Sequence, residues 1–180
     1  MIRSHLRYVS SEVRKCSAVA SICLATADDV TAIQSCNRRN LPENYTVEYI
    51  RQQLKQWPLL SIVAKNDDGD VIGYALGLIE TTALNFPRTG VEKTGHVLSV
   101  AVEEPFRREG LGFRLMKSLH AQFVLQCPPL RSVNLFCRVS NTAAITHYKD
   151  KHGYECTKLL TEYYEDGENA WFMEHQCKGV

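Results

Sequence analysis

The stretch Gly95-His-Val-Leu-Ser-Val-Ala-Val-Glu-Glu-Pro-Phe-Arg-Arg-Glu-Gly-Leu-Gly112 decides the fold of this chain. Its first eight residues, Gly95 to Val102, are apolar nearly throughout, which predicts a buried strand near the centre of a sheet. From Leu111 to Phe123 a leucine or phenylalanine recurs at every fourth position, which predicts an amphipathic helix. A turn between a buried strand and a helix N-terminus presents unpaired backbone N–H groups, so this turn favours an anion.

The turn itself, Arg107-Arg-Glu-Gly-Leu-Gly112, has the composition of a diphosphate cradle. Its two glycines let the backbone approach a ligand closely, and its arginines can add charge-assisted hydrogen bonds, although a solvated surface role for them stays open. It is not a P-loop, because no Gly-Lys-Ser or Gly-Lys-Thr follows, and it lacks the first glycine of a dinucleotide-binding fingerprint. The spacing by itself is weak evidence, because it arises by chance in roughly one chain in six.

Predicted strands and helices alternate on both sides of this stretch. Apolar periodicity, capping residues and turn residues set their limits. The connection from Thr81 to Thr94 is expected to be a long loop. The order βααβββαβαββ predicts an α/β fold in which helices cover a mixed sheet. The predicted elements are strands at about 21–25, 60–65, 71–79, 95–102, 133–138, 154–163 and 169–175 and helices at about 27–39, 47–56, 111–126 and 142–152.

The composition fits one globular domain, with 180 residues of which 44% are hydrophobic and 23% charged. The formal net charge of +1 gives no overall field toward nucleic acid or anionic lipid, so neither is an expected partner. Apolar runs are shorter than the roughly 20 residues that a membrane span requires, and we expect a cytoplasmic protein. The seven cysteines form no Cys-x-x-Cys pair and the six histidines no ligand cluster, so we expect reduced thiols and no metal.

The first 19 residues contain four basic residues and one acid. We expect residues 1–19 to form a poorly ordered N-terminal tail, with organellar targeting as the less favoured alternative. Residues 20–177 are then expected to form the domain.

Five segments of the chain resemble the GNAT superfamily of acyl-CoA-dependent N-acetyltransferases and, within it, the catalytic subunits of eukaryotic N-terminal acetyltransferases. The NatA type resembles the chain best, while the segment from Leu135 to Asn141 looks more like the NatB type. The resemblance implies a GNAT fold, with a mixed central sheet of about seven strands and about four flanking helices, and acetyl-CoA as co-substrate. The segments are Leu41-Pro-Glu-Asn-Tyr45, Gly95–Val102, Arg107–Gly112, Arg138-Val-Ser-Asn141 and Tyr163-Tyr-Glu-Asp-Gly-Glu-Asn-Ala170.

The function that this resemblance implies is transfer of an acetyl group to the α-amino group of nascent protein N-termini by direct attack of the amine. The expected N-termini begin with Ser, Ala, Thr or Gly. Alternatives are NatB-type N-termini that begin Met-Asp or Met-Glu, small amines or lysine side chains, and an acyl-CoA-binding subunit without turnover. The resemblance further implies a helical-repeat auxiliary subunit that positions the catalytic subunit at the ribosome.

Three residues are candidates for catalysis. Glu43 is the expected general base, directly or through water, with a surface carboxylate as the less favoured alternative; an α-amino pKa of about 7.7 to 8.0 requires little basic assistance. The Tyr164 hydroxyl can assist proton transfer and the Tyr148 hydroxyl can bind the leaving thiolate, unless both rings serve packing alone. Phe136 stands where related enzymes commonly carry a histidine, so no histidine base is expected there. His96 either feeds a proton relay or is a structural histidine.

The resemblance divides the remaining site residues between two ligands. A strand backbone N–H near Val100 is the expected donor to the oxyanion. The expected contacts to the peptide N-terminus are Leu41, Pro42, Glu43, Tyr45, His96, Tyr163 and Tyr164. The expected contacts to acetyl-CoA are Val100, Val102, Arg107, Arg108, Gly110, Leu111, Gly112, Asn141 and Tyr148.

Overall fold

The computed structural model describes residues 20–83 and 90–177. Seven strands and four α-helices lie within these two ranges, in the predicted order, together with three short 3-10 turns. The elements are β1 (Ser21–Leu24), α1 (Val30–Asn40), α2 (Val47–Gln56), β2 (Ser61–Lys65), β3 (Val71–Ala83), β4 (Val91–Val102), α3 (Leu111–Gln126), β5 (Ser132–Arg138), α4 (Thr142–His152), β6 (Glu155–Leu160) and β7 (Ala170–Gln176).

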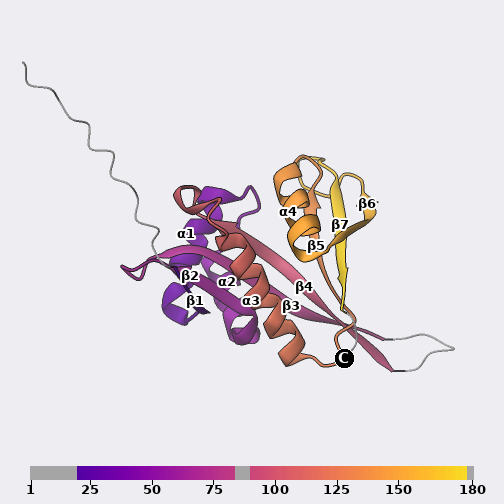
Figure 1. Cartoon of the computed structure of the whole chain (residues 1–180), viewed down its shortest axis with the longest axis horizontal. Helices are drawn as coiled ribbons and strands as arrows, with labels where there is room; N and C mark the ends of the chain where they lie inside the picture. Colours follow the sequence, from indigo (N-terminus) through magenta and orange to yellow (C-terminus); the bar gives the residue numbers. More distant parts are fainter. Residues whose placement is uncertain (1–19, 84–89, 178–180) are drawn as a thin grey trace, which may run out of the picture.

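The seven strands form one sheet in the order β1-β2-β3-β4-β5-β7-β6, so β4 is the central strand, as its apolar sequence predicts. Neighbouring strands are antiparallel except for β4 and β5, which are parallel. These two strands pair only through Gly95 with Val133 and His96 with Asn134, and then diverge (Figure 1). The divergence places the carboxyl ends of β4 and β5 apart, with the turn to α3 at one of them and the turn to α4 at the other.

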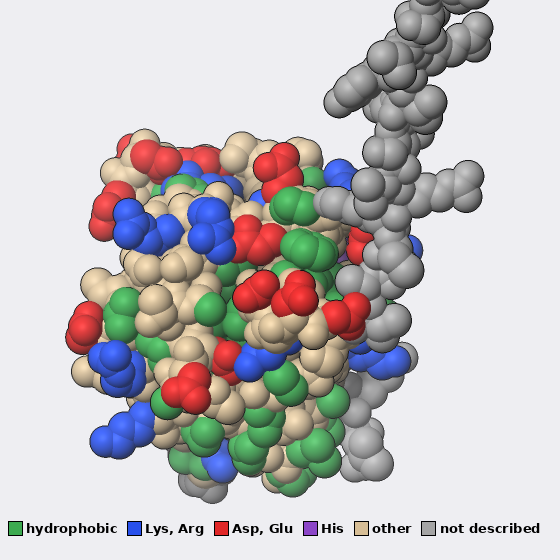
Figure 2. All heavy atoms as spheres, turned by 90° about the vertical axis from the view of Figure 1, so that its left-hand side faces the viewer, with side chains coloured by type: hydrophobic (Ala, Val, Ile, Leu, Met, Phe, Trp, Pro, Cys, Tyr) green, Lys and Arg blue, Asp and Glu red, His purple; other side chains and the backbone are tan. Residues whose placement is uncertain are grey.

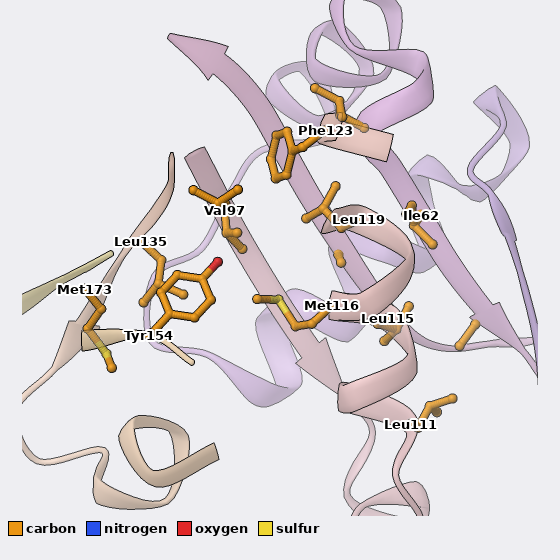
Figure 3. Close-up of a cluster of buried hydrophobic side chains, with 14 of the residues drawn as sticks. Ile62, Val97, Leu111, Leu115, Met116, Leu119, Phe123, Leu135, Tyr154 and Met173 are labelled. Atoms are coloured by element: carbon orange, nitrogen blue, oxygen red, sulfur yellow. The ribbon is translucent and has the colours of Figure 1, made fainter. Parts of the chain in front are cut away.

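Two apolar clusters, one on each face of the sheet, join the helices to it. On one face α3 buries Leu115, Met116 and Leu119 completely against strand residues such as Ile62 and Val97 (Figure 3). The cluster on the other face joins α1 and α2 to the sheet through Ile33, Ile50, Val63, Tyr74 and Leu76. The amphipathic period predicted for α3 is therefore the period of its contact with the sheet.

Close packing of α3 on the sheet requires two glycines in the strands. The ring of Phe123, which is fully buried, lies over Gly77 of β3 and Gly95 of β4. A Cβ atom at Gly77 would stand 2.5 Å from Phe123 Cζ, and one at Gly95 would stand 2.9 Å from Phe123 Cδ1. The start of the stretch that decides the fold therefore leaves room for the Phe123 ring against the sheet.

The prediction of a loop from Thr81 to Thr94 is wrong at both ends. Strand β3 continues to Ala83 and β4 begins at Val91, and their ladder runs out through the pair formed by Ala83 and Val91. Thr81, Thr82 and Ala83 are exposed, so no apolar pattern marks them as a strand. Backbone pairing and the β-propensity of threonine extend the strands here, where burial does not.

The strand predicted at about 154–163 is shorter in the structure, where β6 ends at Leu160. Glu162 has a left-handed backbone conformation with a φ of 51°, and the backbone N–H groups of Tyr163 and Tyr164 both donate to the carbonyl oxygen of Glu168. These features close a compact loop between β6 and β7. The tyrosine pair therefore lies in a loop at the end of the sheet.

No helix in ranges 20–83 and 90–177 is long and apolar enough to cross a membrane. Acidic and basic side chains are interspersed on the face shown in Figure 2, which agrees with a formal net charge of +1. The predicted tail, residues 1–19, lies outside the described residues.

Candidate active site

Two cavities meet where β4 and β5 diverge. One has a volume of about 330 Å³ and the other about 440 Å³. Five residues line both of them, namely Leu41, Val100, Asn141, Ala144 and Tyr148. A ligand in one cavity can therefore come into contact with a ligand in the other beside these residues.

All nine residues predicted to contact acetyl-CoA line the larger cavity. Its floor is the turn from β4 to α3, in which Arg108 and Gly110 both have positive φ angles of 67° and 77°. Gly110 is the N-cap residue of α3, and no side chain caps this helix end, so its first N–H groups are free to bind an anion. We call this larger space the turn cavity.

Arg107 ties the turn to the end of α1. Its Nε donates to the carbonyl oxygen of Val102 at 2.9 Å, and its Nη2 donates to Asn40 Oδ1 at 2.5 Å. A guanidinium has five N–H donors, so the two on Nη1 remain for a phosphate. Arg107 therefore both holds the turn in place and lines the cavity.

All seven residues predicted to contact the peptide line the smaller cavity, which we call the loop cavity. Leu41, Pro42, Glu43 and Tyr45 come from the α1–α2 loop, while the tyrosine pair comes from the β6–β7 loop. The two loops are more than 110 residues apart in the sequence, and the fold brings them together around one cavity.

Arg138, at the end of β5, joins the two loops. Its Nε and Nη2 donate to Glu43 Oε1 at 2.8 and 2.6 Å, and its Nη1 donates to Asp166 Oδ2 at 2.8 Å and Glu168 Oε2 at 2.6 Å. The guanidinium also lies over the Tyr164 ring, 4.0 Å from its centroid. One cation thus holds three carboxylates, and Glu43 Oε2 is left without a hydrogen bond from any described residue.

The buried side-chain amide of Asn37 holds the α1–α2 loop in place. Asn37, which is 0% exposed, donates from Nδ2 to the carbonyl oxygen of Glu43 at 2.9 Å and to the Tyr74 hydroxyl at 3.0 Å. Its Oδ1 accepts from the backbone N–H of Tyr45 at 2.9 Å, and Tyr74 in turn hydrogen-bonds Ser99 of β4 at 2.8 Å. The loop backbone on both sides of Asn44 is therefore fixed to the sheet.

The tyrosines of the two cavities remain protonated. Burial, with the carboxylate of Glu43 nearby, raises the pKa of Tyr164, and burial with Cys137 nearby raises the pKa of Tyr148. Burial raises the pKa of Tyr45 to about 12. The hydroxyls of Tyr148 and Tyr164 make no hydrogen bond to a described residue, so each can donate to a ligand.

His96 and Phe136 lie side by side in the loop cavity. Nδ1 of His96 donates to Asn134 Oδ1 at 2.5 Å, because an amide oxygen only accepts hydrogen bonds. The ring of Phe136 stacks on Tyr163, with centroids 4.7 Å apart, and lies at 5.4 Å from the His96 ring. Phe136 thus supplies an apolar wall and no proton acceptor.

Arg138 and Asn37 are two residues of the site that the sequence reasoning did not assign. Arg138 stands inside a quoted motif, and a charged residue at the end of an apolar strand is a signal that could have been followed. Asn37 lies within a helix and carries no such signal, because only its burial and its three partners reveal its role.

The residues present fit acetyl-CoA. A helix N-terminus without a side-chain cap and the free Nη1 of Arg107 offer donors to a diphosphate. Asn141 uses Oδ1 to accept from Ala144 N at 3.1 Å as the N-cap of α4, which leaves its Nδ2 group for an amide carbonyl. No group of three or more histidine, cysteine or acidic side chains in the described ranges could hold a metal ion.

Comparisons with known proteins agree with this geometry. The sequence model of the acetyltransferase (GNAT) family matches residues 28–154. The catalytic subunit of the N-terminal acetyltransferase A complex of Arabidopsis thaliana is 36% identical over 160 residues, which cover 88% of this chain and 79% of that protein.

Two solved structures have the same fold. Ard1 from Thermoplasma volcanium superimposes with a TM-score of 0.74 and 30% identity, covering 88% of this chain and 98% of that one. A chain of the NatB acetyltransferase complex bound to CoA and MES superimposes with a TM-score of 0.73 and 25% identity, covering 88% and 99%. The chain therefore belongs to the GNAT family of acetyltransferases and, within it, to the N-terminal acetyltransferase catalytic subunits.

Proposed function

We propose that this protein transfers the acetyl group of acetyl-CoA directly to the α-amino group of a protein N-terminus. The meeting of the turn cavity and the loop cavity at Val100 and Tyr148 carries this proposal, because it lets a bound amine reach a bound thioester. Arg107, Arg108, the Gly110–Gly112 backbone and Asn141 hold the coenzyme, and the α1–α2 and β6–β7 loops hold the peptide.

Bound acetyl-CoA supplies an activated acyl group as a thioester. Oε2 of Glu43, directly or through a water molecule, accepts a proton from the α-ammonium group, whose pKa of about 7.7 to 8.0 means that little basic assistance is needed at neutral pH. A backbone N–H near Val100 donates to the carbonyl oxygen as the C–N bond forms. The Tyr148 hydroxyl donates a hydrogen bond to the sulfur as the C–S bond breaks, and the leaving thiolate takes up the second proton, which the nitrogen loses as it becomes an amide. No cysteine carries the acetyl group.

The charges of the loop cavity favour uncharged side chains in the peptide. Arg138 and Glu43 line this cavity, and Arg138 also pairs with Asp166 and Glu168, which do not line it, so the Arg138 cluster carries a net charge of −2. This charge attracts the α-ammonium group and repels an acidic side chain near it. We therefore propose N-termini that begin with Ser, Ala, Thr or Gly, and NatB-type N-termini that begin Met-Asp or Met-Glu are the less favoured alternative.

Acetyl transfer to a peptide panel tests this function. The purified protein is incubated with acetyl-CoA and peptides that differ only in their first two residues, and coenzyme A release is measured. We expect Ser-, Ala-, Thr- and Gly-peptides to be acetylated faster than Met-Asp and Met-Glu peptides. A peptide with a blocked α-amine and a free lysine is the control. Faster release with this control than with any free N-terminus would assign the protein to lysine acetylation.

We also propose that the protein works in the cytoplasm with an auxiliary subunit that places it at the ribosome. The Arabidopsis relative is named as the catalytic subunit of a complex, which supports a partner for this chain. Affinity purification from native cells followed by mass spectrometry tests the partner. Co-purification of one large helical-repeat protein and of ribosomes is the expected result, and recovery of this chain as a monomer would contradict it.

A further inference from the structure

One polar atom beside the turn cavity has no partner among the described residues. Nε2 of His147 is buried and makes no hydrogen bond within residues 20–83 and 90–177. The imidazole lines the turn cavity, and its Nε2 lies 3.8 Å from the position that a Cβ would take at Gly112. A buried nitrogen without a partner is rare in folded proteins, so it requires an explanation.

Ring contacts hold this imidazole between α3 and α4. His147 packs edge-on against His152 with centroids 5.1 Å apart, and His152 stacks on Phe113 of α3 at 5.1 Å. His152 also contacts His120 of α3, at 5.9 Å. The Nε2 of His147 is therefore kept near the first turn of α3, the same turn whose backbone N–H groups lack a side-chain cap.

We propose that His147 is a further ligand of acyl-CoA, which donates a hydrogen bond from Nε2 to the diphosphate and becomes protonated when the diphosphate binds. This inference rests on the proposed binding of acetyl-CoA in the turn cavity. The diphosphate supplies the partner that Nε2 lacks, and a charge-assisted hydrogen bond to a phosphate oxygen is stronger than a neutral one. The contact requires the imidazole to turn so that the buried Nε2 reaches the surface of the cavity that His147 lines.

The charged groups around His147 set the direction of the pH effect. On α4, Lys151 lies one turn after His147, and the His152 ring contacts the His147 ring. On the α3 side, Gly112 faces the His147 ring and Arg108 lines the same cavity. In the ligand-free protein, burial and the nearby Lys151 lower the pKa of the His147 imidazole. An anion beside Nε2 raises that pKa again, so binding takes up a proton, and the affinity rises as the pH falls between the two pKa values.

Calorimetric binding of three probes tests the assignment without turnover. The probes are coenzyme A, 3′-dephospho-coenzyme A and pantetheine, which lacks the diphosphate. His147→Leu should raise the Kd of both coenzymes about tenfold, which equals about 1.4 kcal/mol, and leave that of pantetheine unchanged. An equal loss for pantetheine would overturn the assignment to the diphosphate, and a loss for coenzyme A alone would assign the contact to its 3′-phosphate.

His147→Gln separates the hydrogen bond from the charge, because glutamine keeps an N–H donor that does not titrate. At pH 8.5 this variant should bind coenzyme A like the wild type, but it should not gain the several-fold affinity that the wild type gains on moving to pH 6. The control is His175→Gln, because His175 belongs to the same group of rings and lines neither cavity.

The outcomes for His147 and for the proposed function are distinct. A wild-type protein that binds no coenzyme A would contradict the proposed function itself. A wild-type protein that binds coenzyme A, with His147→Leu binding equally well or His147→Gln following the wild type across the pH range, would overturn the role of His147 alone.

Discussion

Arg138 hydrogen-bonds only one of the two carboxylate oxygens of Glu43. Both hydrogen bonds from the guanidinium end on Oε1, at 2.8 and 2.6 Å, while Oε2 has no bond from a described residue. The carboxylate is thereby held in one orientation with its second oxygen available to a substrate amine. The Arg138 side chain is only 16% exposed, so this ion pair is less screened by solvent than a surface pair.

Glu43→Gln should lower kcat by a factor on the order of 10², because the amide keeps the shape of the side chain and cannot accept a proton. The affinity for acetyl-CoA should not change. Steady-state kinetics between pH 6 and 9 provide the measurement, with Glu48→Gln on the exposed face of α2 as the control. Near-normal turnover of Glu43→Gln across this range would show that another group is the base.

Arg138→Lys should lower kcat about tenfold and raise the KM for the peptide. Lysine keeps the charge, but a single ammonium group cannot hold three carboxylates in the planar geometry of a guanidinium. Arg131→Lys is the matched control, because Arg131 pairs with Glu92 far from both cavities. Equal kinetic losses in the two variants would mean that the Arg138 cluster serves stability rather than the orientation of Glu43.

Gly110→Ala and Gly69→Ala form a matched pair. Both glycines have left-handed φ angles, 77° and 85°, and a Cβ at either one would meet nothing within 4 Å. Each substitution should lower the free energy of unfolding by a similar amount, about 1–2 kcal/mol, which is the penalty for a left-handed conformation at a residue other than glycine. Only Gly110→Ala should weaken acetyl-CoA binding in calorimetry, since Gly69 belongs to the β2–β3 turn.

Gly112→Asp should weaken acetyl-CoA binding further, because it places a carboxylate in the turn cavity. Its thermal stability is measured alongside, so that a loss of affinity can be separated from unfolding. Unchanged acetyl-CoA affinity in a folded Gly112→Asp protein would mean that the diphosphate binds elsewhere.

Acid should destabilise the protein through His120, which hydrogen-bonds the Tyr154 hydroxyl at 2.8 Å. Burial, with His175 and His152 nearby, lowers the pKa of His120 to about 3, so the folded state keeps this imidazole neutral. Its contribution is complete above the unfolded pKa of about 6.5 and is lost as the pH falls toward 3, by at most about 1.4 kcal/mol per pH unit.

His120→Gln should reduce this acid slope, which denaturant unfolding between pH 7.5 and 4 measures. Lys117→Gln, on the exposed face of α3, is the control for a change of one side chain on the same helix. An unchanged slope in His120→Gln would assign the acid sensitivity to other groups.

The local pattern of the sequence was sufficient for most of the fold. Apolar residues at every fourth position gave α3 its contact face, Thr46 and Asn141 cap α2 and α4, and the Asp-Gly turn joins β2 to β3. The predicted ends of two strands were wrong. At Thr81–Ala83 backbone pairing extends a strand whose side chains are exposed, and at Glu162 a tight loop ends the strand early. Neither feature alters apolar periodicity, so neither could be detected in it.

By itself, the sequence determined most of the secondary structure and the strand–turn–helix unit around Arg107–Gly112, because capping, periodicity and glycine placement act within a few positions of the chain. The residues of the two cavities were expected from the resemblance to a known family. Only the tertiary structure decided that Arg138 meets Glu43, 95 residues earlier, and that Nε2 of His147 comes to rest beside Gly112. These contacts depend on strand order, on the single short parallel pairing of β4 with β5 and on the packing of α4 against α3. All three are set by long-range burial, which no local spacing encodes.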